Sequence, residues 1–491
     1  MSIPLLKRTL SSIRNPGFKL PFSPSFSSSS PSAKPSISTV VSVLTHHRSK
    51  SRWRFLNSLC PDGFDPGEFS DIVLHIKNNP HLSLRFFLWT QNKSLCTHNL
   101  VSYSTVIHIL ARGRLRTHAK AVIQTAIRAA ELEDDDGCSN CKQFSRPLRL
   151  FQTLVKTYKR CGSAPFVFDL LIKALLDSRK LEPAIQIIRM LRSRGISPQV
   201  STLNSLILWV SKCEGANAGY AIFREVFGLD CEVKEERVKM KAQASPNVHS
   251  FNTLMMCFYQ DGLVGRVKEI WDQLTESNSI PNSYSYSILM TVFCDQRRMV
   301  EAEELWKEMR LKKLELDAVA YNTIIGGFCK AGSIQRAEEL FREMELSGIE
   351  STFSTFEHLI NGYCETGDID SALLVYKDMR RKNFSLNAST LEAIVRGLVA
   401  ETRLLEALDV FGFTTEDSNF CPTMETYELL INGLCREGEI EAAFKLQAQM
   451  VGKGFKPDSK VYRSFIDAYT NEGNEEMVEK LRKELLEIQL S

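Results

Sequence analysis

Hydrophobic side chains recur along most of this chain at the spacing of one face of a helix. Residues 321–329 carry apolar side chains at the first, fourth, fifth, eighth and ninth places, the i, i+3, i+4, i+7, i+8 pattern of an amphipathic helix. Residues 334–346 repeat this spacing, with charged side chains on the opposite face. Gly332 lies between the two stretches, where a chain leaving a helix can adopt a left-handed conformation at little cost. The pattern therefore predicts two helices joined by a tight turn.

The same pattern returns every 35 residues, so that equivalent places form columns. An aromatic residue stands fourth in a repeat, Cys twelfth, Gly fifteenth, Ala twentieth and Met twenty-seventh. These columns hold Tyr286, Tyr321, Phe356 and Tyr427; Cys294, Cys329, Cys364 and Cys435; Gly262, Gly332, Gly367, Gly438 and Gly473; Ala302, Ala337, Ala372 and Ala443; and Met309, Met344, Met379 and Met450. A lone helical hairpin buries too little apolar surface to offset the entropy of ordering it, so neighbours must stack. We predict an all-α superhelical solenoid of about nine or ten helix-turn-helix repeats.

The repeat pattern also predicts how the chain is divided. We expect degenerate helical repeats over residues 62–130, an acidic loop over 131–147 and a regular array over 148–491. The repeats of the array are expected at 165–199, 200–247, 248–282, 283–317, 318–352, 353–387, 388–423, 424–458 and 459–491. The repeat 200–247 carries about 13 extra residues.

The first 61 residues differ in composition from the rest. They contain nine Lys or Arg residues, no Asp or Glu, and a serine run at 27–30, which is typical of an organelle transit peptide. A disordered arm that contacts nucleic acid is the alternative. Residues 3–14 are compatible with a short basic amphipathic helix, which favours the mitochondrion, whereas the Ser-rich remainder would also suit a chloroplast.

Charge and cysteine content exclude some classes of function. Without the first 61 residues, 52 Lys and Arg stand against 58 Asp and Glu, so non-specific coating of a polyanion is not expected. There is no apolar run of about 18 residues for a membrane span. The 13 cysteines do not imply disulfides, because four of them occupy a buried helical column. Cys138 and Cys141 have metal-like spacing, but a second pair at the usual spacing is missing, so we predict no metal site.

Several repeats share a motif with a known family. The sequence Ala320-Tyr-Asn-Thr-Ile-Ile resembles the family's opening Thr-Tyr-Asn-Thr-Leu-Ile, and Gly454-Phe-Lys-Pro-Asp resembles its closing Gly-x-x-Pro-Asp. The chain thus resembles pentatricopeptide repeat proteins of the pure 35-residue P-class found in plant organelles. A tetratricopeptide array, whose groove holds peptides, has a period of about 34 residues and a different signature.

This resemblance implies a site. In the family, one repeat reads one RNA base, through the fifth residue and the last, while the second residue stacks on the base. The implied base-reading pairs are Asn204 with Asn247, Asn252 with Asn282, Ser287 with Asp317, and Asn322 with Thr352; the implied stacking residues are His249, Tyr284 and Val319. The resemblance predicts 5′-C-C-G-pyrimidine for these four repeats. Asp169, Glu357, Glu392 and Glu428 place carboxylates in the fifth column and depart from the family's code.

The predicted function is sequence-selective binding of single-stranded organellar RNA, acting in transcript stabilisation, processing, splicing or translation. Other RNA-processing proteins are candidate partners, and we expect no cofactor, no membrane and no small-molecule substrate. An editing deaminase needs His-x-Glu and a later Pro-Cys-x-x-Cys, which the sequence lacks, so no enzyme is predicted. The scattered His108, His118 and His358 are interpreted as structural. The alternative function is a protein-interaction scaffold whose helical groove binds a peptide or a ribonucleoprotein partner.

Overall fold

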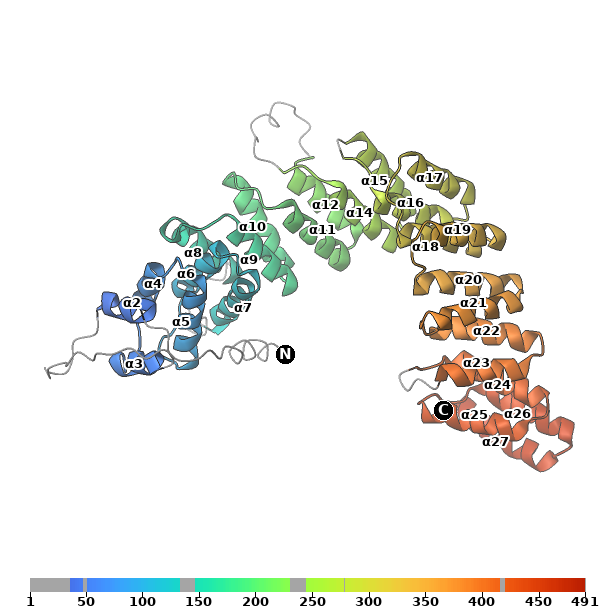
Figure 1. Cartoon of the computed structure of the whole chain (residues 1–491). Helices are drawn as coiled ribbons and strands as arrows, with labels where there is room; N and C mark the ends of the chain where they lie inside the picture. The colour runs from blue at the N-terminus through green and yellow to red at the C-terminus, as the bar shows by residue number, and fades with distance from the viewer. Residues whose placement is uncertain are drawn as a thin grey trace. The chain divides into compact units, whose positions relative to one another are not determined.

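A computed structural model describes residues 36–46, 51–132, 146–229, 244–277, 279–415 and 420–490 (Figure 1). Within these ranges every regular element is an α-helix, and the helices form stacked pairs. The predicted all-α fold of helix-turn-helix repeats is therefore confirmed. Contacts divide the chain into two units, Met1–Val167 and Phe168–Ser491, each of which is described by itself.

The first unit is built from helices that pack on an aromatic core. Its helices are α2 (Ile37–His46), α3 (Ser51–Leu59), α4 (Pro66–His75), α5 (Pro80–Asn92), α6 (Leu100–Arg112), α7 (Arg116–Leu132) and α8 (Arg146–Cys161). Phe69 and Phe86 stack with their ring centroids 5.2 Å apart, and both rings are buried. Helix α8 packs on α6 and α7, although the sequence pattern did not single it out.

Two of these helices lie in the segment for which the sequence predicted a leader. Helix α2 buries Val40, Val43 and Leu44, and it packs on α3 and α4. These three residues have the i, i+3, i+4 spacing of a helix face, which the basic and Ser-rich composition of the segment obscured. Residues 1–35 and most of the expected acidic loop lie outside the described residues.

The second unit begins within α9 and repeats one arrangement to its end. Its helices are α9 (Phe166–Asp177), α10 (Leu181–Ser193), α11 (Val200–Glu214), α12 (Ala216–Phe227), α14 (Val248–Gln260), α15 (Val264–Glu276), α16 (Ser283–Asp295), α17 (Met299–Leu311), α18 (Ala318–Lys330), α19 (Ile334–Leu346), α20 (Phe353–Thr366), α21 (Ile369–Arg381), α22 (Ala388–Ala400), α23 (Leu404–Thr415), α24 (Met424–Arg436), α25 (Ile440–Gly452), α26 (Ser459–Glu472) and α27 (Glu475–Leu490). From α11 onward, each first helix packs on the second helix of its own repeat and on the first helix of the next. The first helices therefore form one continuous row.

The regular recurrence of apolar columns within this chain explains how the repeats pack. The column of Ala and the column of Met are sealed from solvent, because the small Ala lets two helices approach and Met fills the space beside it. Of the cysteine column, Cys294, Cys329 and Cys435 are buried and Cys364 is half-buried. A twenty-fourth column, not noticed in the sequence, supplies aromatic rings to the fourth column of the next repeat. Trp306 thus meets Tyr321 edge-on, with ring centroids 4.8 Å apart.

The turn inside most repeats has a left-handed backbone at the fifteenth column, whichever residue is present; in the repeat 200–247, α11 continues through this column to Glu214 and the positive φ falls at Gly215. Gly332 has a φ of 74° and Gly438 a φ of 81°, as the glycine pattern predicted. At the same column, Arg297 and Thr402 both have a φ of 59°. The left-handed region costs a residue with a side chain roughly 1–2 kcal/mol, so these turns are strained where Gly is missing.

Replacing Thr402 by Gly should therefore stabilise the second unit by about 1 kcal/mol, since relief of strain exceeds the extra backbone entropy of Gly in the unfolded chain. The Thr402 side chain is exposed, so no packing is lost. Urea unfolding followed by circular dichroism measures the change. Gly332→Ala is the matched control: an added Cβ meets nothing within 4 Å, so the expected loss of stability reports on the backbone alone. A Thr402→Gly variant less stable than the parent would contradict this account.

Acidification should loosen the first unit. His108 is sealed from solvent, with Nε2 3.0 Å from the Leu154 carbonyl oxygen and Nδ1 without a partner among the described residues. Burial lowers the pKa of His108 to about 4, although the hydrogen bond to Leu154 raises it, and burial lowers the pKa of His98 to about 4 as well.

Both folded-state pKa values lie below the unfolded value of about 6.5, so the unfolded chain binds more protons between pH 6.5 and 4. Stability is expected to be full above pH 6.5 and to fall toward pH 4. Hydrogen exchange of α6 and α8, corrected for the intrinsic effect of pH, measures this loss. The double variant His98→Asn, His108→Gln should show a shallower pH dependence; an unchanged slope would exclude these two histidines as its source.

Candidate functional site

A row of polar side chains lies where the first helices of the second unit begin. At most of these junctions the side chain of the last residue of a repeat caps the first helix of the next, although Gln199 makes no such bond to α11. Asn247 Oδ1 accepts from Ser250 N at 3.1 Å, Asn282 Oδ1 accepts from Ser285 N at 3.0 Å, and Asp317 Oδ1 accepts from Ala320 N at 2.9 Å. These caps satisfy backbone N–H groups that have no partner within the helix. The last residue of a repeat is thereby held in a fixed place.

The fifth residue of the same repeat reaches this cap from the preceding first helix. Asn252 Nδ2 donates to Asn282 Oδ1 at 3.2 Å, while Ser285 Oγ donates to Asn252 Oδ1 at 2.8 Å. Asn252 is only 2% exposed. Three side chains from two repeats are thus joined, and we call the fifth residue, the last residue and the third residue of the next repeat a triad.

Two further predicted pairs form triads of the same kind. Asn322 Nδ2 donates to Thr352 Oγ1 at 2.8 Å, and Thr355 Oγ1 donates to Asn322 Oδ1 at 2.6 Å. At the inserted repeat, Asn204 Nδ2 lies 3.4 Å from Asn247 Oδ1, and Ser250 Oγ donates to Asn204 Oδ1 at 2.7 Å. The structure therefore brings three of the four predicted pairs together.

The pair Ser287 and Asp317 does not form a triad. Ser287 Oγ donates instead to the Ser283 carbonyl oxygen of its own helix at 3.1 Å. The third place of the next repeat is Ala320, which has no hydroxyl to complete the arrangement. This pair is therefore held only by the helix cap that Asp317 provides.

The three candidate stacking residues lie on the surface beside the triads. Tyr284 is 43% exposed and Val319 is 50% exposed, and His249 is exposed as well. Each is the second residue of a first helix, three residues before the fifth column. Exposed flat or apolar side chains at regular spacing beside polar groups form a surface suited to a planar ligand.

The carboxylates of the fifth column occupy the same places as the amides. Thr423 Oγ1 donates to Glu392 Oε2 at 2.9 Å, and Thr390 Oγ1 lies 3.4 Å from Glu357 Oε1. The side chains of Glu392 and Glu428 are each only 12% exposed. Burial raises the pKa of Glu357 and of Glu428, which a freely solvated carboxylate would not show.

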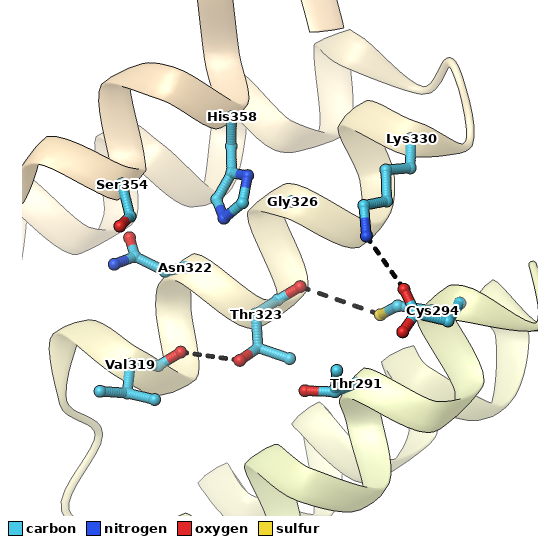
Figure 2. Close-up of a pocket in the computed structure, with 11 residues that line it drawn as sticks. Thr291, Cys294, Val319, Asn322, Thr323, Gly326, Lys330, Ser354 and His358 are labelled. Carbon is cyan, nitrogen blue, oxygen red and sulfur yellow. Dashed lines mark hydrogen bonds and ion pairs between the residues drawn. The ribbon is translucent and has the colours of Figure 1, made fainter. Parts of the chain in front are cut away.

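A cavity of about 320 Å³ opens beside the triad of Asn322 (Figure 2). Helix α16 contributes Thr291, helix α18 contributes Val319 and Gly326, and helix α20 contributes Ser354 and His358. Gly326 leaves this space, because a Cβ there would lie 3.0 Å from Nε2 of His358. Nearby, Lys330 Nζ is paired with Asp295 Oδ1 at 2.9 Å.

The structure also bears on metal binding and on membrane-spanning helices. No group of three or more metal-binding side chains occurs among the described residues, and Cys138 and Cys141 lie outside them. In the part of the chain that the structure describes, no helix is both long and apolar enough to cross a membrane.

The sequence interpretation missed two parts of this site. The third column did not enter the prediction, although it repeatedly holds a hydroxyl side chain, at Ser250, Ser285, Thr355, Thr390 and Thr426. His358, interpreted from the sequence as structural, lines the cavity beside Asn322. No sequence pattern marks His358, because its neighbour Gly326 lies on another helix.

Comparison with known proteins gives consistent matches. Models described as "PPR repeat" match residues 284–314, 312–345 and 460–490, and a model described as "PPR repeat family" matches 246–295, 352–400 and 422–471. A pentatricopeptide repeat-containing protein of Arabidopsis thaliana is 56% identical over 496 residues, which cover 99% of this chain and 98% of that protein. A second such Arabidopsis protein, named as mitochondrial, is 26% identical over 34% of this chain and 29% of its own length.

Among solved structures, the pentatricopeptide repeat protein PPR10 from maize matches with a TM-score of 0.43 and 15% identity. The match covers 93% of this chain and 74% of that one.

Asn252→Ala should destabilise the second unit by about 1–2 kcal/mol, because it removes the two hydrogen bonds that Asn252 makes at a buried place, while Ser285 Oγ and Asn282 Oδ1 stay bonded to each other. Ser287→Ala is the matched comparison at the next repeat, and it should cost only a few tenths of a kcal/mol, since Ser287 bonds to its own helix. Urea unfolding of both variants measures the difference. Equal costs would show that the triad adds nothing to the cohesion of adjacent repeats.

Proposed function

Because the chain belongs to the pentatricopeptide repeat family, we propose that it binds single-stranded RNA sequence-selectively through the triads of its second unit. The observation that carries this proposal is the pairing of the fifth and last residues of a repeat at Asn204, Asn252 and Asn322. These pairs occur in three of four successive repeats along the row of first helices, which suits a ligand that is itself a regular chain of bases.

The triads leave hydrogen-bonding capacity for a base. A side-chain amide offers two N–H donors and two acceptor lone pairs. The triad of Asn252 uses one N–H and one lone pair, so one of each is left to meet a base edge. Because its partners already fix the amide, little side-chain entropy is lost when the base arrives.

The second column supplies the stacking surfaces in this proposal. A base placed against the amide of Asn322 would contact Val319 on one face, and a base at Ser287 would contact Tyr284. Base stacking on such side chains contributes about 1–3 kcal/mol per base for aromatic residues and tolerates any sequence. Selectivity then comes from the triads and affinity largely from the second column.

The proposed preference is 5′-C-C-G-pyrimidine, running with the chain from the repeat 200–247 to the repeat 318–352. Its third position rests on Ser287 and Asp317, which do not contact each other in a triad, so selectivity for guanine should be the weakest of the four.

The C-terminal repeats suit a second role. Glu357, Glu392 and Glu428 present poorly exposed carboxylates where the amides stand in the central repeats. Carboxylates repel phosphate and can only accept hydrogen bonds when ionised. We propose that these repeats either act as spacers or bind another protein, the scaffold role that the sequence left open.

We propose an organelle, with the mitochondrion preferred over the chloroplast, as the place of action. The support is the acid-free basic N-terminal segment and the mitochondrial names of several relatives. Because α2 begins at Ile37 and packs on α4, the targeting signal is proposed to lie within residues 1–36 rather than to extend to residue 61. The proposed action is post-transcriptional and does not involve catalysis: a bound array denies a stretch of RNA to nucleases or to a competing base-paired fold.

The decisive measurement is selection from a randomised single-stranded RNA pool by the full chain at physiological salt. Enrichment of C-C-G-pyrimidine is expected. The double variant Asn252→Ala, Asn322→Ala should lose about tenfold discrimination at the two corresponding positions, given the usual value of a specific base contact.

Asn92→Ala, an exposed Asn at the end of α5 in the first unit, is the control and should select the same motif. Both proteins are first checked for folding by circular dichroism. Unchanged selectivity in the double variant would reject the triads as readers. Absence of any RNA selection by the parent chain would favour the scaffold role.

A further inference from the structure

The cavity beside Asn322 results from two residues that occur together at one junction. Gly326 is the ninth residue of its repeat, and His358 is the sixth residue of the next. In the other repeats of the array the ninth residue has a side chain, as with Met256 and Asn361, and the sixth is never His. This junction therefore differs from its neighbours in both shape and chemistry.

The imidazole of His358 fills the place that a ninth side chain would take. A Cβ on Gly326 would lie 3.0 Å from both Cδ2 and Nε2 of the ring. Figure 2 shows the ring extending from α20 toward α18, with Asn322 and Ser354 to one side. The ring is half-buried, and it lines a cavity of about 320 Å³.

His358 has unused hydrogen-bonding capacity. Neither ring nitrogen forms a hydrogen bond with a described residue, and neither is sealed from solvent. Burial, and to a smaller extent the positive charge of Lys330, lowers the pKa of His358, which keeps the ring neutral at pH 7 with one donor and one acceptor. A half-buried polar ring without protein partners is suited to a ligand group that enters the cavity.

The residues that line the cavity indicate which part of a bound RNA would lie beside His358. Val319 and Ser354 are the second residues of successive repeats, so they flank the base that Asn322 would read. The Ser354 side chain is too small to cover a base. His358 follows it by four residues on α20 and lies on the same face one turn along.

We infer that His358 is a further specificity-determining residue, whose N–H donates a hydrogen bond to the O2 carbonyl of the pyrimidine read by Asn322 and Thr352. This inference rests on the proposed RNA-binding function. On the Watson–Crick edge, cytosine and uracil both present the O2 acceptor, whereas adenine presents C2–H at that place and guanine presents its amino donor. His358 thus favours pyrimidines over purines without separating cytosine from uracil.

The test is a set of binding measurements with the full chain, using the RNA that the parent protein selects. Each nucleotide in turn is replaced by an abasic residue, and affinity is measured for the parent, His358→Phe and Asn322→Ala. Phe keeps a flat ring in the same space but has no ring nitrogen. For intact RNA, His358→Phe should weaken binding about tenfold, the usual effect of leaving a buried donor or acceptor unpaired.

This loss should vanish when one particular nucleotide is abasic, and that nucleotide should be the one at which the effect of Asn322→Ala also vanishes. A purine at that position should bind the parent and His358→Phe equally. His358→Gln, which keeps a donor, should recover most of the affinity. His81→Phe, on α5 in the first unit, should bind as the parent does.

The outcomes separate the two levels of the proposal. If the parent selects an RNA but the loss in His358→Phe is the same with every abasic RNA, His358 has only a structural role and the inference is overturned while RNA binding stands. Coupling to a nucleotide other than that of Asn322 would overturn it as well. If the parent selects no RNA, the proposed function fails and this inference fails with it.

Discussion

Hydrogen bonding at the start of the first helices sets the register between most neighbouring repeats of the second unit. A helix begins with backbone N–H groups that have no partner within the helix, and here the previous repeat supplies the acceptor. The fifth residue of that previous repeat then bonds to the acceptor, and the third residue of the new helix bonds to the fifth. Two neighbouring repeats are therefore tied together by directional contacts that tolerate only one alignment.

The apolar columns have a different task. Contacts such as those of Trp306 with Tyr321, or those made by the sealed Met344, remove apolar surface from water, but such burial has little directionality. Cohesion between repeats thus comes largely from the apolar columns, and alignment comes largely from the triads. Because the triads also present the unused donors and acceptors, the surface proposed to read bases cannot be altered without changing the contact between repeats.

The sequence predicts most of this architecture, because a 35-residue period reports the helix pairs, the turn and the buried columns directly. The sequence predicts less well those features that depend on backbone strain at one residue or on a residue of another helix. The left-handed turns at Arg297 and Thr402 are hidden, since the pattern there relied on Gly. Ser287 and Asp317, which the family resemblance implies as one base-reading pair, form no triad, since Ser287 bonds to its own helix and Ala320 has no hydroxyl. The cavity at His358 depends on Gly326, which is distant in sequence and adjacent only after the repeats stack.

The triad also redefines what an interchangeable module of this protein is. Counted from one first helix to the next, a repeat separates Asn322 and Thr352 from Thr355, the residue that orients the amide. A designer who transplants repeats at that boundary would pair each imported amide with a foreign third residue, and Ala320 shows that such a junction does not reproduce the contact. A cassette running from the fourth residue of one repeat to the third residue of the next would carry its own hydrogen-bond partners. The unit that carries all of its own hydrogen-bond partners therefore begins three residues after the start of the 35-residue repeat seen in the sequence.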